Sequence, residues 1–105
     1  FSPRTSPDSV AWMMARLQKE STRIGAELLM PPRPWPPTGV ETPALVMGGD
    51  ADVFLPVSAF EETAAHWKAD LHLLAGAPHA LMADTAYWRP CAETMLDWLS
   101  RKIGR

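Results

Sequence analysis

The spacing of apolar residues differs between the two halves of this 105-residue chain. In the first 30 residues, apolar side chains recur every three or four positions, as in amphipathic helices. Ser6-Pro7-Asp8 predicts a helix start, because it combines a capping hydroxyl, a proline in the first turn and an acidic residue near the helix dipole. The polar stretch 18–21 is expected to divide the region into two helices. The periodic residues, which should face a core or line an apolar pocket, are Val10, Met13, Met14, Leu17, Ile24 and Leu28.

A proline-rich connector follows at residues 31–42. Six of the 11 prolines lie between positions 31 and 43. Each proline fixes φ and lacks a backbone donor, so this stretch is predicted to be neither helix nor central strand. We expect an extended, partly polyproline II conformation. A second interpretation, suggested by Pro34-Trp35-Pro36-Pro37, is an SH3-type ligand.

The second half of the chain alternates between strand and helix patterns. The apolar run 43–47 ends in Gly48 and Gly49, which predicts a buried strand that leaves its sheet through a tight turn. The run 71–74, followed by Gly76, predicts a second strand. Because a helical segment connects the two strands, they should be parallel and form a right-handed β-α-β unit.

Each predicted strand is followed by a predicted helix. Ser58 and Glu61 match a capping box, and the helix that they open carries Phe60, Ala64 and Trp67 on its apolar face. Asp84 is expected to cap the last helix. The apolar side of that helix comprises Trp88, Ala92, Met95, Leu99 and Ile103, with Cys91 and Leu96 beside them.

These elements predict an α/β fold that is part of a larger, doubly wound, mostly parallel sheet. Parallel strands are normally buried on both faces, and two strands with about four helices cannot supply such a sheet. We therefore expect the neighbouring strands to come from another polypeptide or from residues removed from this one. The first residue, Phe1, fits a chain produced by processing, proteolysis or truncation.

Composition and charge exclude several classes of function. The chain is 47% hydrophobic, so it is not disordered throughout, and its net charge of −2 gives no reason to expect nucleic acid. No apolar run is long enough to span a membrane, and a cytoplasmic location is our expectation. Cys91 is the single cysteine, and His66 and His72 lack partners at metal-ligand spacing. We predict neither a metal site nor a bound cofactor.

Candidate catalytic residues follow both predicted strands. Asp50 and Asp52 come after the first strand, and His79 comes after the second. The carboxyl ends of adjacent parallel strands meet at one edge of a sheet, so these loops should lie side by side. A carboxylate there can hold the Nδ1–H of an imidazole and fix its tautomer for general base catalysis. On this argument either aspartate is a candidate, and the other shapes the turn.

Two stretches resemble the α/β-hydrolase family. Pro43-Ala-Leu-Val-Met-Gly-Gly-Asp-Ala-Asp-Val-Phe-Leu-Pro56 resembles the family's acid loop, in which the catalytic aspartate precedes a proline by four positions. Asp52 occupies that position. Leu73-Leu-Ala-Gly-Ala-Pro-His-Ala-Leu-Met82 resembles the last strand and the histidine loop, with His79 at the catalytic position. The order of the two residues, 27 positions apart across one helix and one strand, also fits the family.

The resemblance implies a serine hydrolase of the lysophospholipase-like or monoacylglycerol-lipase-like branch. It would cleave an ester or related acyl bond in a small-molecule substrate through a Ser-His-Asp triad, with His79 as the base and Asp52 orienting it. Residues 1–30 would form the end of a cap or lid, and residues 43–105 the final β-α-β-α unit.

Two features depart from the family pattern. Pro78 precedes His79 where the family usually has Gly-x-Gly-His, and the sequence contains no Gly-x-Ser-x-Gly. The expected partner is therefore an N-terminal fragment of the same hydrolase that carries the serine. The alternative is a non-catalytic, small α/β module that acts in binding or interaction.

Overall fold

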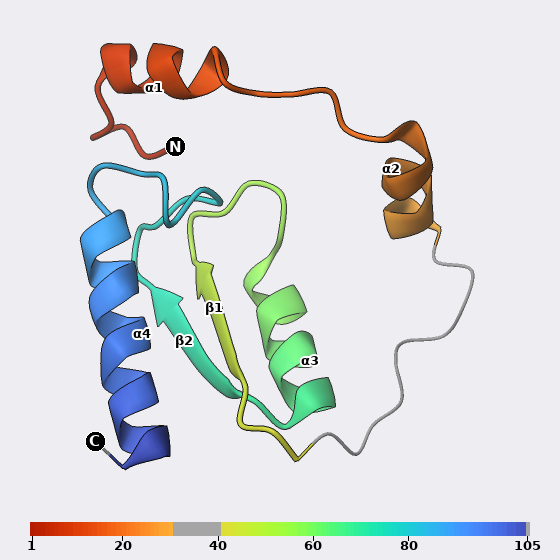
Figure 1. Cartoon of the computed structure of the whole chain (residues 1–105), viewed down its shortest axis with the longest axis vertical. Coiled ribbons are helices and arrows are strands. Elements are labelled where there is room, and N and C mark those ends of the chain that lie inside the picture. Colours follow the sequence, from red (N-terminus) through yellow and green to blue (C-terminus); the bar gives the residue numbers. More distant parts are fainter. Residues whose placement is uncertain (31–40, 105) are drawn as a thin grey trace.

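The computed structural model describes residues 1–30 and 41–104 (Figure 1). Within them the element order is α1 (Pro7–Met14), α2 (Thr22–Leu29), β1 (Leu45–Gly49), α3 (Val57–Trp67), β2 (Asp70–Leu74) and α4 (Trp88–Ile103). The predicted mixture of helices and parallel strands is confirmed. Residues 31–40 of the predicted connector, and with them the SH3-ligand interpretation, lie outside the described residues.

The two strands form a parallel pair, as predicted. Leu45 lies opposite Asp70, and Gly49 lies opposite Leu74. Strand β1 begins at Leu45, two residues after the start of the predicted run, and it includes Gly48 and Gly49, which pair with the neighbouring strand. The tight turn expected at these glycines begins only after them.

The glycines are needed in β1 because other groups approach its backbone closely. A Cβ atom at Gly48 would lie 2.6 Å from the ring of Phe60, which comes from α3. A Cβ atom at Gly49 would overlap the backbone carbonyl of Ala77, in the loop after β2. The two glycines thus let a helix and a loop pack directly against the strand.

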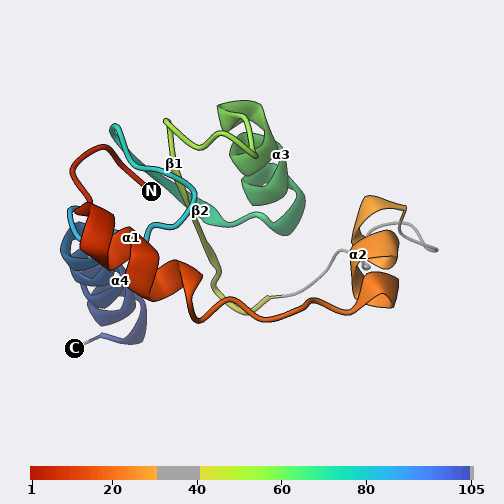
Figure 2. The same ribbon diagram turned by 90° about the horizontal axis from the view of Figure 1, so that it is seen from above.

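Helices α3 and α4 lie on opposite sides of the strand pair (Figures 1 and 2). Helix α3 buries Phe60 and Ala64, as its predicted apolar face required. On the other side, Cys91 of α4 is buried in a cluster with Leu74 and Ala77. The partly buried side chains that pack against this cluster are Met47, Leu81, Tyr87 and Met95.

The predicted starts of the last two helices were wrong. Helix α3 begins at Val57, directly after the extended residue Pro56, and has no side-chain cap. Ser58 is already inside this helix, so its hydroxyl is not at the capping position of the predicted box. Helix α4 follows Tyr87 and also lacks a side-chain cap, because the carboxylate of Asp84 binds the N-terminal segment and the Ala86 amide instead.

The predicted division of the first 30 residues is confirmed. The hydroxyl of Ser6 accepts from the Ser9 amide at the start of α1, and the hydroxyl of Ser21 accepts from the Ile24 amide at the start of α2. Neither helix contains a buried residue, however, so the predicted core face was wrong. Helix α1 lies over the loop that leads into α4, and α2 lies away from the sheet (Figures 1 and 2).

Helix α4 also exposes part of its predicted apolar side. Leu96, Leu99 and Ile103 are 65%, 44% and 62% exposed. In the same part of the helix, Trp98 and Lys102 both bind the carboxylate of Asp70, the first residue of β2. In the described part of the chain, none of the helices combines the length and apolar character needed to cross a membrane.

Candidate functional site

The loops that follow β1 and β2 are joined by backbone hydrogen bonds. The amide of Asp50 donates to the carbonyl of Leu74 at 3.3 Å, and the amide of Ala51 donates to the carbonyl of Ala77 at 3.1 Å. The parallel register places both strand ends at the same edge, as expected for a ligand-binding edge of an α/β sheet.

Asp52 and His79, the two predicted site residues, are in direct contact. The Nδ1 atom of His79 lies 2.7 Å from Oδ2 of Asp52. The Asp52 side chain is only 3% exposed, whereas that of His79 is 51% exposed. The imidazole is therefore held on one side by a buried carboxylate and open to solvent elsewhere.

The Asp52 carboxylate is fixed by its own loop. Its Oδ1 atom accepts hydrogen bonds from the amides of Phe54, at 2.7 Å, and Leu55, at 3.0 Å. The ring of Phe54 meets the imidazole of His79 edge to face, with 5.0 Å between ring centroids. The turn held by the Asp52 carboxylate thus extends to Leu55, and Pro56 follows it as the residue directly before α3.

The charge of Asp52 follows from these contacts. Burial raises its pKa, but the hydrogen bonds from His79, Leu55 and Phe54 together outweigh that effect. The pKa of Asp52 therefore lies below its usual value, and the carboxylate is ionised at neutral pH. An ionised carboxylate accepts the Nδ1 proton of a neutral imidazole, which leaves Nε2 as the proton acceptor.

Asp50, the alternative acid, contacts a different group. Its Oδ1 atom accepts a hydrogen bond from the amide of Gly76, in the loop after β2. Gly76 has a φ of 71°, a conformation that favours glycine. Asp50 thus connects the two loops, and Asp52 is the aspartate that contacts His79.

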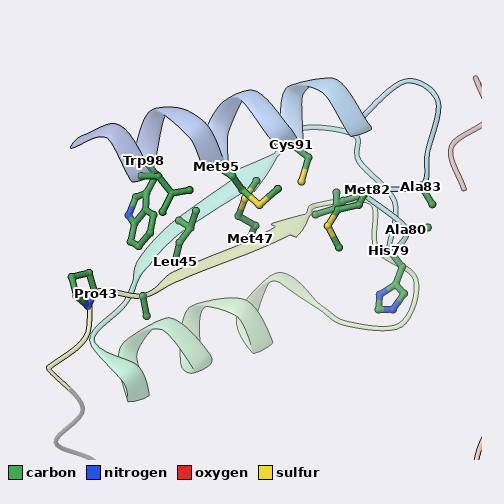
Figure 3. Close-up of a pocket in the computed structure, with 13 residues that line it drawn as sticks. Pro43, Leu45, Met47, His79, Ala80, Met82, Ala83, Cys91, Met95 and Trp98 are labelled. Atoms are coloured by element: carbon green, nitrogen blue, oxygen red, sulfur yellow. The ribbon is translucent and has the colours of Figure 1, made fainter. Parts of the chain in front are cut away.

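An open apolar groove of about 780 Å³ runs between β1 and α4 and ends at the loop that carries His79 (Figure 3). Among the described residues that line it, the ionisable side chains are His79 and the buried thiol of Cys91. The main contributors are Leu45, Met47, Leu81, Met82, Met95, Trp98 and Leu99. These residues suit an apolar ligand or an apolar segment of protein.

The remaining candidates lie outside this arrangement. His66 packs its ring edge-on against Trp67, and His72 is exposed on β2. Cys91 is 3% exposed, and burial raises the pKa of its thiol. Within residues 1–30 and 41–104, no three His, Cys, Asp or Glu side chains are grouped to hold a metal ion.

One buried residue near the site was not predicted to have its observed role. Asp84 is fully buried and accepts hydrogen bonds from Ser2 and Thr5, at the other end of the chain. The sequence offers no spacing signal for this contact, since the partners are separated by 82 and 79 positions.

Comparison of the chain with models of protein families finds no match, and comparisons with curated proteins and with solved structures find none. The hydrolase resemblance and the catalytic roles of Asp52 and His79 therefore stay predictions.

Proposed function

We propose that this chain is the C-terminal part of an α/β-hydrolase-type serine hydrolase that cleaves an ester or related acyl bond. The observation that carries the proposal is the 2.7 Å contact between Nδ1 of His79 and the buried carboxylate of Asp52. A histidine held in this way at the carboxyl end of a parallel strand pair has the arrangement of a triad base and its orienting acid.

His79 is the proton carrier in the proposed reaction. Its Nε2 atom takes the proton from a serine hydroxyl as the serine oxygen bonds to the carbonyl carbon of the substrate. The imidazolium then gives that proton to the leaving oxygen as the acyl bond breaks. In the second half-reaction, His79 takes a proton from water, which attacks the acyl-enzyme, and returns it to the serine.

Asp52 has an orienting role in both steps. Its ionised carboxylate holds the Nδ1–H tautomer and stabilises the positive charge that forms on the ring. The amides of Phe54 and Leu55 keep the carboxylate in place. Because the carboxylate is fixed, it holds the imidazole of His79 in the reactive orientation before the substrate binds.

The serine and the oxyanion donors are assigned to an N-terminal fragment of the same hydrolase. The 105 residues contain no Gly-x-Ser-x-Gly motif, so none of their serines has the setting of the family's nucleophile. The exposed apolar residues of α4 and the apolar groove support the presence of such a partner, because exposed apolar patches mark interaction surfaces.

The test is to isolate the affinity-tagged chain from its natural source and treat the material with a fluorophosphonate probe. We expect a co-purifying polypeptide to be labelled on the serine of a Gly-x-Ser-x-Gly sequence, and the complex to hydrolyse a p-nitrophenyl ester. Substituting His79→Ala or Asp52→Asn should lower turnover by about 10³-fold to 10⁴-fold.

The matched control is His72→Ala, since His72 is an exposed histidine on β2, the strand that precedes the loop of His79. It should leave turnover unchanged. Turnover that survives both His79→Ala and Asp52→Asn would overturn the assigned roles. A folded chain that stays alone and carries no labelled partner would instead favour the non-catalytic binding module.

A further inference from the structure

The buried carboxylate of Asp84 connects the N-terminal segment to the loop that carries His79. Oδ2 of Asp84 accepts from the Ser2 amide at 2.6 Å and from the Thr5 hydroxyl at 2.7 Å. Oδ1 accepts from the Ser2 hydroxyl and from the Ala86 amide, both at 2.9 Å. A buried charge is tolerated only with such compensation, and here four donors supply it.

The N-terminal segment is shaped for this contact. The amide of Thr5 donates to the carbonyl of Ser2, and this turn brings both hydroxyls to the same carboxylate. Ser2 and Thr5 are only 7% and 8% exposed, and Asp84 is the acceptor for the Ser2 amide and for both hydroxyls.

Local backbone hydrogen bonds connect Asp84 with His79 on one side and with α4 on the other. The amide of Leu81 donates to the carbonyl of His79, and the amide of Asp84 donates to the carbonyl of Ala80. The carbonyl of Asp84 in turn accepts from the amide of Trp88, in the first turn of α4. One end of the loop is thus held by the strand edge and the other by Asp84.

We propose that Asp84 is a positioning residue, which anchors residues 2–5 and thereby fixes the loop that holds His79 against Asp52. This inference deepens the proposed function, since it rests on the Asp52–His79 pair as the proposed catalytic pair. When residues 2–5 are bound to Asp84, the imidazole of His79 is held in line with Asp52; when they are released, that alignment is lost for part of the time.

The substitution Asp84→Asn tests this coupling because it keeps the shape of the side chain. The new amide nitrogen donates rather than accepts, so it leaves donors of Ser2, Thr5 or Ala86 without a partner. The loop should then open more often and hold His79 against Asp52 for less of the time.

The experiment is NMR spectroscopy of the full 105-residue chain at about pH 8, where a neutral histidine ring reports its tautomer. In the unsubstituted chain, the ring nitrogens of His79 should show the Nδ1–H form. In Asp84→Asn, the fraction of that form should fall, and exchange of the backbone amides of Leu81 and of the substituted residue should rise about tenfold or more.

Thr5→Val is the second variant, because it removes one donor without changing the Asp84 side chain. It should shift the His79 tautomer in the same direction by a smaller amount, and it decides the question if Asp84→Asn does not fold. Asp97→Asn is the matched control, since Asp97 is an exposed aspartate paired with Arg101 on α4.

An unchanged His79 tautomer in the folded variants would overturn the proposal, even if the amides of residues 2–5 exchanged faster. That result would give Asp84 a purely local anchoring role. The NMR measurement does not require turnover. Failure of the Asp84 proposal is therefore distinguishable from failure of the hydrolase proposal, which is judged by probe labelling and ester hydrolysis.

Discussion

Three aspartates near the strand ends have different roles because their carboxylates meet different donors. Asp52 meets the imidazole of His79, Asp50 meets the backbone amide of Gly76, and Asp84 meets the N-terminal segment. The first role is predicted by the resemblance of residues 43–56 and 73–82 to the α/β-hydrolase family, in which the catalytic aspartate lies four positions before a proline. The sequence does not predict the role of Asp84, because no local pattern connects that residue to Ser2 or Thr5.

Asp84 should make stability depend on pH in the acid range. Burial raises its pKa, but the hydrogen bonds from Ser2, Thr5 and Ala86 lower it from 3.8 to about 2. A pKa that folding lowers contributes stability above the unfolded value, and that contribution is lost as the pH falls through the folded value. The shift corresponds to about 2 kcal/mol in the free energy of unfolding.

We therefore expect the stability difference between the unsubstituted chain and Asp84→Asn to narrow by about 2 kcal/mol as the pH falls from about 5 to about 2. Urea denaturation followed by tryptophan fluorescence measures this difference at each pH. A constant difference over that range would show that ionisation of Asp84 does not stabilise the fold. Asp97→Asn serves as the comparison for an exposed carboxylate.

The strands and helices agree with the apolar periodicity, but their ends depend on contacts between elements. Strand β1 includes Gly48 and Gly49 because pairing with β2 continues through them. Helix α3 begins one residue before Ser58, and the carboxylate of Asp84 is occupied elsewhere. A capping pattern gives a possible helix start, and the surrounding backbone decides which start is used.

The close approach at Gly49 predicts a strong effect of a single added methyl group. Gly49→Ala would place a Cβ atom against the backbone of Ala77, which cannot move without disturbing the loop before His79. We expect the free energy of unfolding to fall by about 3 kcal/mol. Thermal and urea unfolding of the variant measure the loss.

Gly25→Ala is the matched control for that substitution. Gly25 lies in α2, and an added Cβ atom there would meet nothing within 4 Å. Its unfolding midpoint should stay close to that of the unsubstituted chain or rise slightly, because alanine favours helix. Equal effects of the two substitutions would contradict the packing argument.

Within residues 1–30 and 41–104, the molecule buries little apolar surface. The buried apolar residues are Phe60, Ala64, Leu74, Ala77 and Cys91, whereas many large apolar side chains are exposed within the described ranges. The sheet contains two strands there, so it gives α1, α2 and the end of α4 little to pack against. This arrangement supports the proposed partner, whose surface would cover these side chains.

The exposed apolar surface should make the isolated chain associate with itself. Leu96 and Leu99 of α4 are 65% and 44% exposed, and they lie on one stretch of the helix. We expect sedimentation velocity to show species larger than a monomer, and the double substitution Leu96→Gln and Leu99→Gln to reduce them. A chain that stays monomeric at all concentrations would contradict this expectation, and Asp97→Asn on the same helix is the control.

Local periodicity, the parallel β-α-β connection and the residues that directly follow each strand predict the kinds of element, their order and the candidates Asp50, Asp52 and His79. The resemblance to the α/β-hydrolase family then favours Asp52 over Asp50. The folded structure shows which aspartate contacts His79, where the strands and helices begin and end, and that Asp84 binds Ser2 and Thr5. These features depend on hydrogen bonds between residues that are far apart in the sequence. The spacing of apolar residues carries no information about which donor binds which acceptor.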